Sequence, residues 1–210
     1  MSRYIGPVCR LCRREGIKLM LKGPRCETAK CPMEKQWRSN PPGMHAWRRG
    51  KGSDYAIRLR EKQKVKRYYS VYERQFMIYF RRAERLKENT GTALLQLLER
   101  RLDNVVYKSG FAPSRKGGRT MVGQGHIYVN GRRVNRPSYN VNQGDRITIK
   151  PSDKSKKLAK SNLEISEGRA QQPWLQVDPG NLEITVAALP SRDDVQIPIE
   201  EQLIVEMCSR

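Results

Sequence analysis

Four of the five cysteines lie between residues 9 and 31, and their spacing is typical of a metal site. Cys9 and Cys12 form a Cys-x-x-Cys pair, and Cys26 and Cys31 follow as a second pair with four residues between them. Thiolates at this spacing can surround one Zn²⁺ ion as a tetrahedron. Four thiolates leave no coordination position for water, so such a zinc would stabilise the segment and would not activate a water molecule.

Two disulfides, free thiols and an iron–sulfur cluster are the alternatives to zinc. The N-terminus shows no signal peptide and the chain no apolar run of membrane-spanning length, so we expect a reducing cytosol, in which grouped cysteines favour metal. Nearby basic side chains, such as Arg10 and Lys30, favour deprotonated thiolates. Cys208 stands alone among apolar neighbours, and we expect an ordinary buried thiol there.

The charge of the chain indicates a polyanionic partner. Lys and Arg total 42 against 21 Asp and Glu, which gives a formal net charge of +21. Solubility alone calls for a net charge of no more than about 8 in a small domain. Residues 1–160 hold the positive excess, whereas residues 161–210 are acidic. Nucleic acid is therefore the expected partner, and an anionic membrane surface is the main alternative.

A basic loop at residues 40–52 precedes the helices that must position the basic side chains. In this loop His45 or Trp47 could stack on a base, and a single hydrogen bond is the alternative role for His45. Ser53 and Asp54 are typical helix-start residues, and they predict a strongly cationic helix over 55–69. Such a helix would repel itself without an anionic partner. Ser70 and Glu73 match a capping box, which predicts the start of a second helix at Ser70.

This second helix should bury one aromatic-rich face and present arginines on the other. Its apolar positions are Phe76, Met77, Tyr79 and Phe80, and its arginines are Arg74, Arg81, Arg82 and Arg85. A third helix is predicted from Thr92 to a stop at Gly110.

A compact module follows. Ser114 is expected to cap a helix that carries Arg115, Lys116 and Arg119 at its N-terminal end, where free N–H groups also attract phosphate. Asn130-Gly131 predicts a hairpin with a type I′ turn over 125–134, and a further strand is predicted within 142–150.

The C-terminal part is less regular in its sequence. The Lys- and Ser-rich run at 151–160 is interpreted as a mobile loop. Residues 174–186 alternate as strands around an Asp-Pro-Gly-Asn turn, in which Gly180 would tolerate a positive φ. A short helix over 199–207 is expected to pack back on the helical arm.

These elements predict an α+β protein, with a mainly helical N-terminal domain that carries the zinc knot and an inserted module of a helix pair and a small curled antiparallel sheet. The expected parts are the zinc knot and basic loop at 1–50, the helical arm at 51–94 completed by 190–210, and the inserted module at 95–189. An RNA-modifying enzyme and a zinc-dependent DNA regulator are the alternative functions. The chain shows no phosphate loop, zinc-protease motif or catalytic constellation, so we do not expect an enzyme.

Several short motifs resemble known families. Residues 101–107, 110–112, 125–131, 134–139 and 144–145 resemble the S4 RNA-binding domain, which also occurs in pseudouridine synthases, a heat-shock protein and tyrosyl-tRNA synthetases. Upstream, residues 41–45, 53–55, 59–64 and 72–76 resemble the bacterial ribosomal S4 family itself. The resemblance extends over essentially the whole chain, and the spacing of the four cysteines matches the zinc-bearing branch of that family.

The resemblance implies a structural protein of the small ribosomal subunit, working in the cytoplasm with one structural zinc. It implies a primary binder of ribosomal RNA that nucleates assembly of the 5′ domain, with neighbours that include ribosomal protein S5. It also implies a place where messenger RNA enters the subunit and a role in translational accuracy. It implies neither a membrane nor a small-molecule substrate.

We expect RNA contacts from basic and polar side chains of the N-terminal segment, the cationic helix and the module. These residues are Arg3, Arg13, Arg14, Lys22, Arg25, Lys30, Lys35, His45, Arg48, Arg49, Lys51, Arg58, Arg60, Lys62, Lys64, Lys66, Arg67, Arg115, Lys116, Arg119, His126, Asn130, Arg132 and Arg133.

Overall fold

The computed structural model describes residues 4–46, 52–166 and 172–209. The chain divides into two compact units, the first made of Met1–Leu94 and Ile197–Arg210 and the second of Leu95–Gln196. The second unit is thus inserted into the first. It ends at Gln196, beyond residue 189, where the sequence had suggested the boundary.

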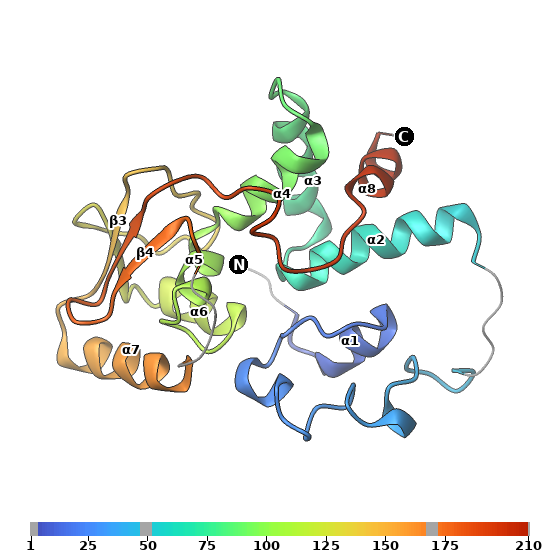
Figure 1. Cartoon of the computed structure of the whole chain (residues 1–210), viewed down its shortest axis with the longest axis horizontal. Coiled ribbons are helices and arrows are strands. Elements are labelled where there is room, and N and C mark those ends of the chain that lie inside the picture. Colours follow the sequence, from blue (N-terminus) through green and yellow to red (C-terminus); the bar gives the residue numbers. More distant parts are fainter. Residues whose placement is uncertain (1–3, 47–51, 167–171, 210) are drawn as a thin grey trace. The chain divides into compact units, whose positions relative to one another are not determined.

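The described residues form helices and one five-stranded antiparallel sheet, which confirms the α+β class (Figure 1). None of the helices in this described part has the length and apolar character needed to cross a membrane. The helices are α1 (Cys9–Glu15), α2 (Asp54–Tyr68), α3 (Glu73–Glu84), α4 (Thr90–Glu99), α5 (Leu102–Lys108), α6 (Arg115–Gly123), α7 (Asp153–Ser166) and α8 (Glu201–Cys208), with short 3-10 turns η1 (Gly23–Cys26) and η2 (Gln36–Arg38). The strands are β1 (Ile127–Val129), β2 (Arg132–Arg133), β3 (Arg146–Ile149), β4 (Leu175–Asp178) and β5 (Glu183–Val186).

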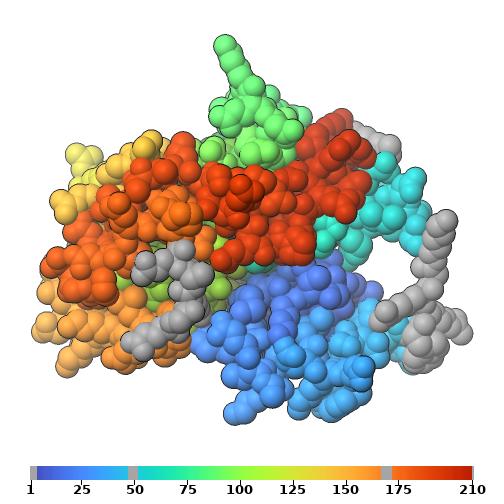
Figure 2. Space-filling model, viewed as in Figure 1, coloured from blue at the N-terminus to red at the C-terminus, as the bar shows by residue number. Residues whose placement is uncertain are grey.

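Helix α2 is the long element of the first unit and confirms the cationic helix predicted from Ser53 and Asp54. The Ser53 hydroxyl accepts a hydrogen bond from the Ala56 amide at 3.3 Å and so satisfies one free N–H of the first turn. Helix α8 packs against α2, as expected, and Arg58 Nε donates to Glu206 Oε2 at 2.6 Å. Figure 2 shows the red spheres of the C-terminal segment directly against the cyan spheres of α2.

The predicted capping box at Ser70 is wrong. Helix α3 begins at Glu73, and its N-cap residue Tyr72 has no side-chain cap hydrogen bond. Ser70 lies in the left-handed region with φ of 54°, outside the helix, and Glu73 contacts Lys62 and Lys66 of α2 instead of the Ser70 backbone. Two lysines compete for the carboxylate more strongly than one backbone N–H does.

The aromatic face predicted for α3 is confirmed. Phe76, Tyr79 and Phe80 are buried, and Met77 is half-buried beside them. Ala83 continues the same face into the last turn and is fully buried.

The single helix predicted from Thr92 to Gly110 is two helices, α4 and α5, with a break at Arg101. Arg101 adopts an extended conformation (φ −66°, ψ 134°) and forms an isolated antiparallel bridge with Asn140. Beside it, the Leu102 amide donates to the Tyr139 carbonyl at 2.8 Å. Backbone groups from a distant loop therefore replace the helical hydrogen bonds at this point, which the local apolar pattern could not reveal.

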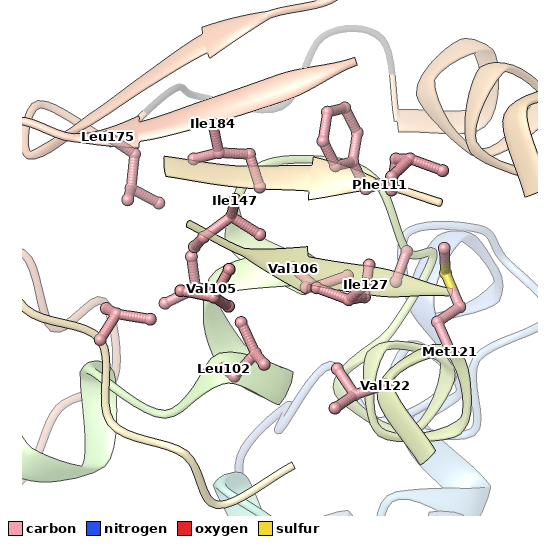
Figure 3. Close-up of a cluster of buried hydrophobic side chains, with 14 of the residues drawn as sticks. Leu102, Val105, Val106, Phe111, Met121, Val122, Ile127, Ile147, Leu175 and Ile184 are labelled. Atoms are coloured by element: carbon pink, nitrogen blue, oxygen red, sulfur yellow. The ribbon is translucent and has the colours of Figure 1, made fainter. Parts of the chain in front are cut away.

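The sheet has the strand order β2-β1-β3-β5-β4, and all neighbours are antiparallel. Asn130 and Gly131, with φ of 49° and 76°, confirm the predicted type I′ turn between β1 and β2. Figure 3 shows Val105 and Val106 of α5 packed beneath Ile127 and Ile147 of the sheet. Together with the other buried apolar side chains of this cluster they form the core of the second unit.

The predicted strands around residues 174–186 are confirmed as β4 and β5. Asp178 Oδ1 accepts from the amides of Gly180 and Asn181 at 2.9 and 3.2 Å and so holds the turn. A positive φ occurs near this turn at Leu182, with a value of 55°, and not at Gly180.

The mobile loop predicted at 151–160 is wrong, because these residues form most of α7. The buried positions of α7 are Ser155, Ala159, Asn162 and Ser166, which recur at helical spacing. The Asn162 side chain donates to the Phe111 carbonyl at 2.9 Å. Small and polar residues make this buried face, so the sequence lacked the large apolar residues that usually mark a helix.

Helices α5 and α6 lie close together because Gly118 has no side chain. A Cβ atom at Gly118 would lie 2.5 Å from the Asp103 carbonyl oxygen, whereas one at Gly123 of the same helix would meet nothing within 4 Å. Gly118 is thus a packing requirement, although glycine lowers the helix propensity.

We predict that Gly118→Ala lowers the free energy of unfolding by about 1–3 kcal/mol, because the backbone of α5 must move away. Gly123→Ala is the matched control and should raise that free energy by up to about 1 kcal/mol through helix propensity alone. Urea unfolding followed by circular dichroism measures both. Equal stabilisation by the two substitutions would contradict the close packing.

Candidate nucleic-acid interface and cysteine cluster

The four N-terminal cysteines are brought into one small region of the first unit. Cys9 and Cys12 lie one turn apart on α1, Cys26 ends η1, and Cys31 follows in a turn. Cys12, Cys26 and Cys31 are buried and Cys9 is half-buried. All are free thiols, so the structure contains neither of the disulfides considered as alternatives.

The electrostatics of this cluster reflect how closely the thiols lie. Burial raises the pKa of Cys12, and the charges of Cys26, Cys9 and Cys31 raise it further, while a backbone hydrogen bond from Leu19 lowers it. Burial likewise raises the pKa of Cys26, which accepts a hydrogen bond from the Lys22 amide to its Sγ at 3.3 Å. Backbone N–H groups directed at sulfur stabilise a thiolate, the form that binds metal.

Within the ranges 4–46, 52–166 and 172–209, no three Cys, His, Asp or Glu side chains are arranged so as to hold a metal ion as they stand. Cys208 belongs to a different environment on α8, where burial raises its pKa and the charges that act on it are those of Lys62, Glu73, Glu84 and Lys66.

The cations of α2 were predicted to contact RNA, but the structure pairs them with carboxylates of the same unit. Glu15 of α1, whose side chain is only 1% exposed, pairs with Arg67 and lies 3.5 Å from Arg60. Burial raises the pKa of Glu15, and the two arginines oppose this. These ion pairs attach the cysteine-bearing segment to α2.

The other cations of α2 are paired in the same way. Glu73 of α3 accepts from Lys62 and from Lys66 at 2.5 Å each, and these bonds outweigh burial and lower the pKa of Glu73. Lys64 pairs with Glu61, and Arg58 pairs with Glu206 of α8. The anionic partner that the helix requires is therefore found inside the protein, and α2 does not present unpaired cations.

Arg115 was predicted to contact phosphate at the start of α6, but it is buried with 4% exposure. The predicted cap is confirmed, because Ser114 Oγ accepts from the Gly117 amide at 3.2 Å. Arg115 Nε donates to Asn104 Oδ1 at 2.8 Å, and its guanidinium lies over the Tyr107 ring at 4.7 Å. The side chain thus joins α6 to α5, and RNA contact by this buried residue stays a prediction.

The remaining cations of α6 are half-buried. Lys116 and Arg119 both lie at intermediate exposure. Arg119 Nη1 lies 3.4 Å from Asp103 Oδ2, and the same carboxylate receives two hydrogen bonds from the Arg101 guanidinium, at 3.0 and 2.6 Å.

The hairpin presents its cations to solvent. Arg132 and Arg133 are both exposed on β2, and Arg136, three residues beyond the strand, is also exposed. The structure records no ion pair for any of these three among the residues it describes.

Two polar candidates on the module already have partners within the fold. Asn130 Nδ2 donates to Asp145 Oδ1 at 2.8 Å, so Asn130 holds the hairpin turn. His126 Nδ1 lies 2.9 Å from Ser155 Oγ and connects the start of β1 to α7.

Of the residues predicted to contact RNA in the N-terminal segment, some hold the fold together and others are exposed to solvent. Arg13 and Arg14 bind the carbonyls of Asn40 and Pro42 at 2.7 and 3.0 Å and hold the following loop against α1. Side chains exposed to solvent are those of Lys22, Arg25, Lys30, Lys35 and His45. Arg3, Trp47, Arg48, Arg49 and Lys51 lie outside the described residues.

Comparison with known proteins covers the whole chain. Residues 3–99 match the family described as the ribosomal protein S4/S9 N-terminal domain, and residues 100–147 match the S4 domain. The chain is 55% identical over 210 residues to small ribosomal subunit protein uS4A of Symbiobacterium thermophilum. It is 52% identical over 211 residues to uS4 of Thermus thermophilus and 52% identical over 210 residues to uS4 of Halothermothrix orenii. Each alignment covers 100% of both chains.

The two family matches adjoin at residues 99 and 100, within a few residues of the point at which the second compact unit begins. The chain belongs to the ribosomal protein S4 family of the small subunit, a family of structural proteins and not of enzymes.

Proposed function

We propose that this chain is a primary binder of small-subunit ribosomal RNA, which nucleates assembly of the 5′ domain in the bacterial cytoplasm. The exposed arginines of the hairpin, Arg132, Arg133 and Arg136, carry this proposal, because they have no ion pair among the described residues and belong to a module that resembles an RNA-binding domain. The net charge of +21 supplies a long-range attraction for RNA.

The proposal extends to the neighbours of the chain in the subunit. We place it beside ribosomal protein S5 and where messenger RNA enters, with a role in translational accuracy. The similarity to proteins named uS4 over their full length supports this position. The basic loop at 40–52, only part of which the structure describes, is the segment we expect to meet messenger RNA.

We further propose one structural zinc held by Cys9, Cys12, Cys26 and Cys31. The chemistry of the donor set suits zinc, because four thiols can supply four thiolates and two of them receive backbone hydrogen bonds, although the thiols do not converge on one point in the structure as they stand. Zinc bound by four thiolates supplies no open coordination position and would serve as a cross-link in a segment that buries few apolar side chains. In this role the cysteines fix the segment that Glu15 attaches to α2.

The RNA proposal predicts that affinity for a 5′-domain fragment of small-subunit ribosomal RNA falls steeply with salt. Replacing Arg132 and Arg133 by Gln should weaken binding and make the salt dependence shallower by about 2 units of slope, with the unfolding midpoint unchanged.

Arg115→Gln is the contrasting variant. It should lower the unfolding midpoint, because it removes a buried hydrogen bond and a cation–π contact. Filter binding at several potassium chloride concentrations gives the slopes. Binding that does not change with salt, or a hairpin variant that binds like the wild type, would contradict the proposal.

The zinc proposal predicts one zinc per chain after purification without chelators, measured by plasma mass spectrometry. Cys12→Ser and Cys26→Ser should each lose the metal and make residues 4–46 more sensitive to thermolysin. Cys208→Ser is the matched control and should keep the full zinc content, because its thiol lies in another environment. A metal-free wild-type chain with a protease-resistant N-terminal segment would refute the site.

A further inference from the structure

Helix α3 carries a row of arginines along the face opposite its core. Arg74, Arg81 and Arg85 lie at i, i+7 and i+11, with Ile78 between them at i+4 and Arg82 beside the row. We call Arg74, Arg81, Arg82 and Arg85 the α3 arginine stripe. Residues at this spacing share one helix face.

The direction of the stripe is fixed by what lies on the other side of the helix. Phe76 and Ala83 are fully buried, and they sit on the face opposite Arg74, Arg81 and Arg85. All four stripe arginines are exposed. The core therefore prevents the helix from turning its cations inward.

These arginines are not neutralised within the described part of the chain. The structure records no ion pair or hydrogen bond from their guanidinium groups, whereas every cation of α2 from Arg58 to Arg67 has a carboxylate partner. The carboxylates at the two ends of α3 form no recorded ion pair with the stripe arginines. Glu73 binds the lysines of α2, and Glu84 lies close enough to Cys208 to influence its thiol.

The chemistry of the stripe favours a row of phosphates. All of its cations are arginines, whose planar guanidinium groups bind phosphate through two parallel hydrogen bonds and are always charged. From Arg74 to Arg85 the helix rises by about 16 Å, at about 1.5 Å per residue, so the stripe is much longer than one anion requires. An extended phosphate backbone is long enough to contact all the arginines of the stripe.

Other partners fit less well. A protein interface needs aromatic or large apolar anchors, and along the stripe the exposed large apolar side chains are Ile78, at 36% exposure, and Leu86, at 45%, just beyond Arg85. A membrane-bound helix inserts its apolar face, but the apolar face of α3 is already occupied by the core of its own unit.

We propose that the α3 arginine stripe is an RNA-contact surface of the first unit, separate from the hairpin of the second unit, which binds the phosphate backbone of ribosomal RNA. The proposal rests on the proposed function, and it adds a site on a helix whose arginines were not among the RNA contacts expected from the sequence. Because phosphates carry no sequence information, the stripe contributes affinity and orientation and does not select bases.

The test compares the full-length wild-type chain with a triple variant, Arg74→Gln, Arg81→Gln and Arg85→Gln. The matched control removes three exposed cations from the second unit by Lys154→Gln, Lys157→Gln and Lys160→Gln on α7. Affinity for the 5′-domain ribosomal RNA fragment is measured over a range of salt concentrations. Thermal unfolding of each chain shows that the exposed substitutions leave the fold intact.

We expect the stripe variant to bind roughly tenfold or more weakly at 0.1 M salt, with a salt slope shallower by about 2 to 3 units, whereas the control loses clearly less. A further variant with Lys at the three positions should keep the wild-type slope and lose part of the affinity, because charge is retained without the guanidinium fork.

If the stripe and control variants lost the same affinity for RNA, net charge alone would explain the binding. That result would refute the proposal that the stripe is an RNA-contact surface. Wild-type affinity in the stripe variant would also overturn it, while the salt-dependent binding of the wild type would leave the proposed function standing. If the wild type itself failed to bind the RNA fragment, both the proposed function and the proposal that the stripe binds RNA would be refuted.

Discussion

Neutralisation of α2 by carboxylates from other segments is the interaction on which the first unit depends. A helix with cations at so many positions repels itself in isolation, and its partners come from α1, α3 and α8. Glu15 is the most deeply buried of these carboxylates. A buried carboxylate that lost its arginines would leave an uncompensated charge, so the pairs fix which segments must lie together even if each contributes little net stability.

The second unit is stabilised differently, by an apolar core with a few buried polar contacts at its margin. Its helices and sheet enclose branched aliphatic side chains, and Asp103 and Arg101 close the edge with a bidentate pair. Gly118 lets α6 approach α5, and Arg115 then joins the two helices from inside. This rigid arrangement positions the hairpin whose arginines remain in solvent.

The division between paired and unpaired cations links the fold to function. A chain with twice as many basic as acidic side chains can neutralise only part of its own charge. Among the described residues every cation of α2 from Arg58 to Arg67 is paired with a carboxylate, whereas Arg132 and the α3 arginine stripe are exposed to solvent. A surface whose arginines have no carboxylate partner attracts an external polyanion most strongly. No carboxylate there competes with the polyanion for the arginines, so the electrostatic free energy of binding is greatest.

The sequence by itself determined the features that depend on neighbouring residues: the paired spacing of the cysteines, the Ser53 cap and the Asn130-Gly131 turn. It also determined the family, through motifs spread along the chain. Only the tertiary structure decided that α5 begins after a break at Arg101, that residues 153–160 belong to α7, and that the cations of α2 are paired. The physical reason is distance along the chain: Glu15 meets Arg67, and Arg101 meets Asn140, only after folding, and a local pattern contains no trace of such partners.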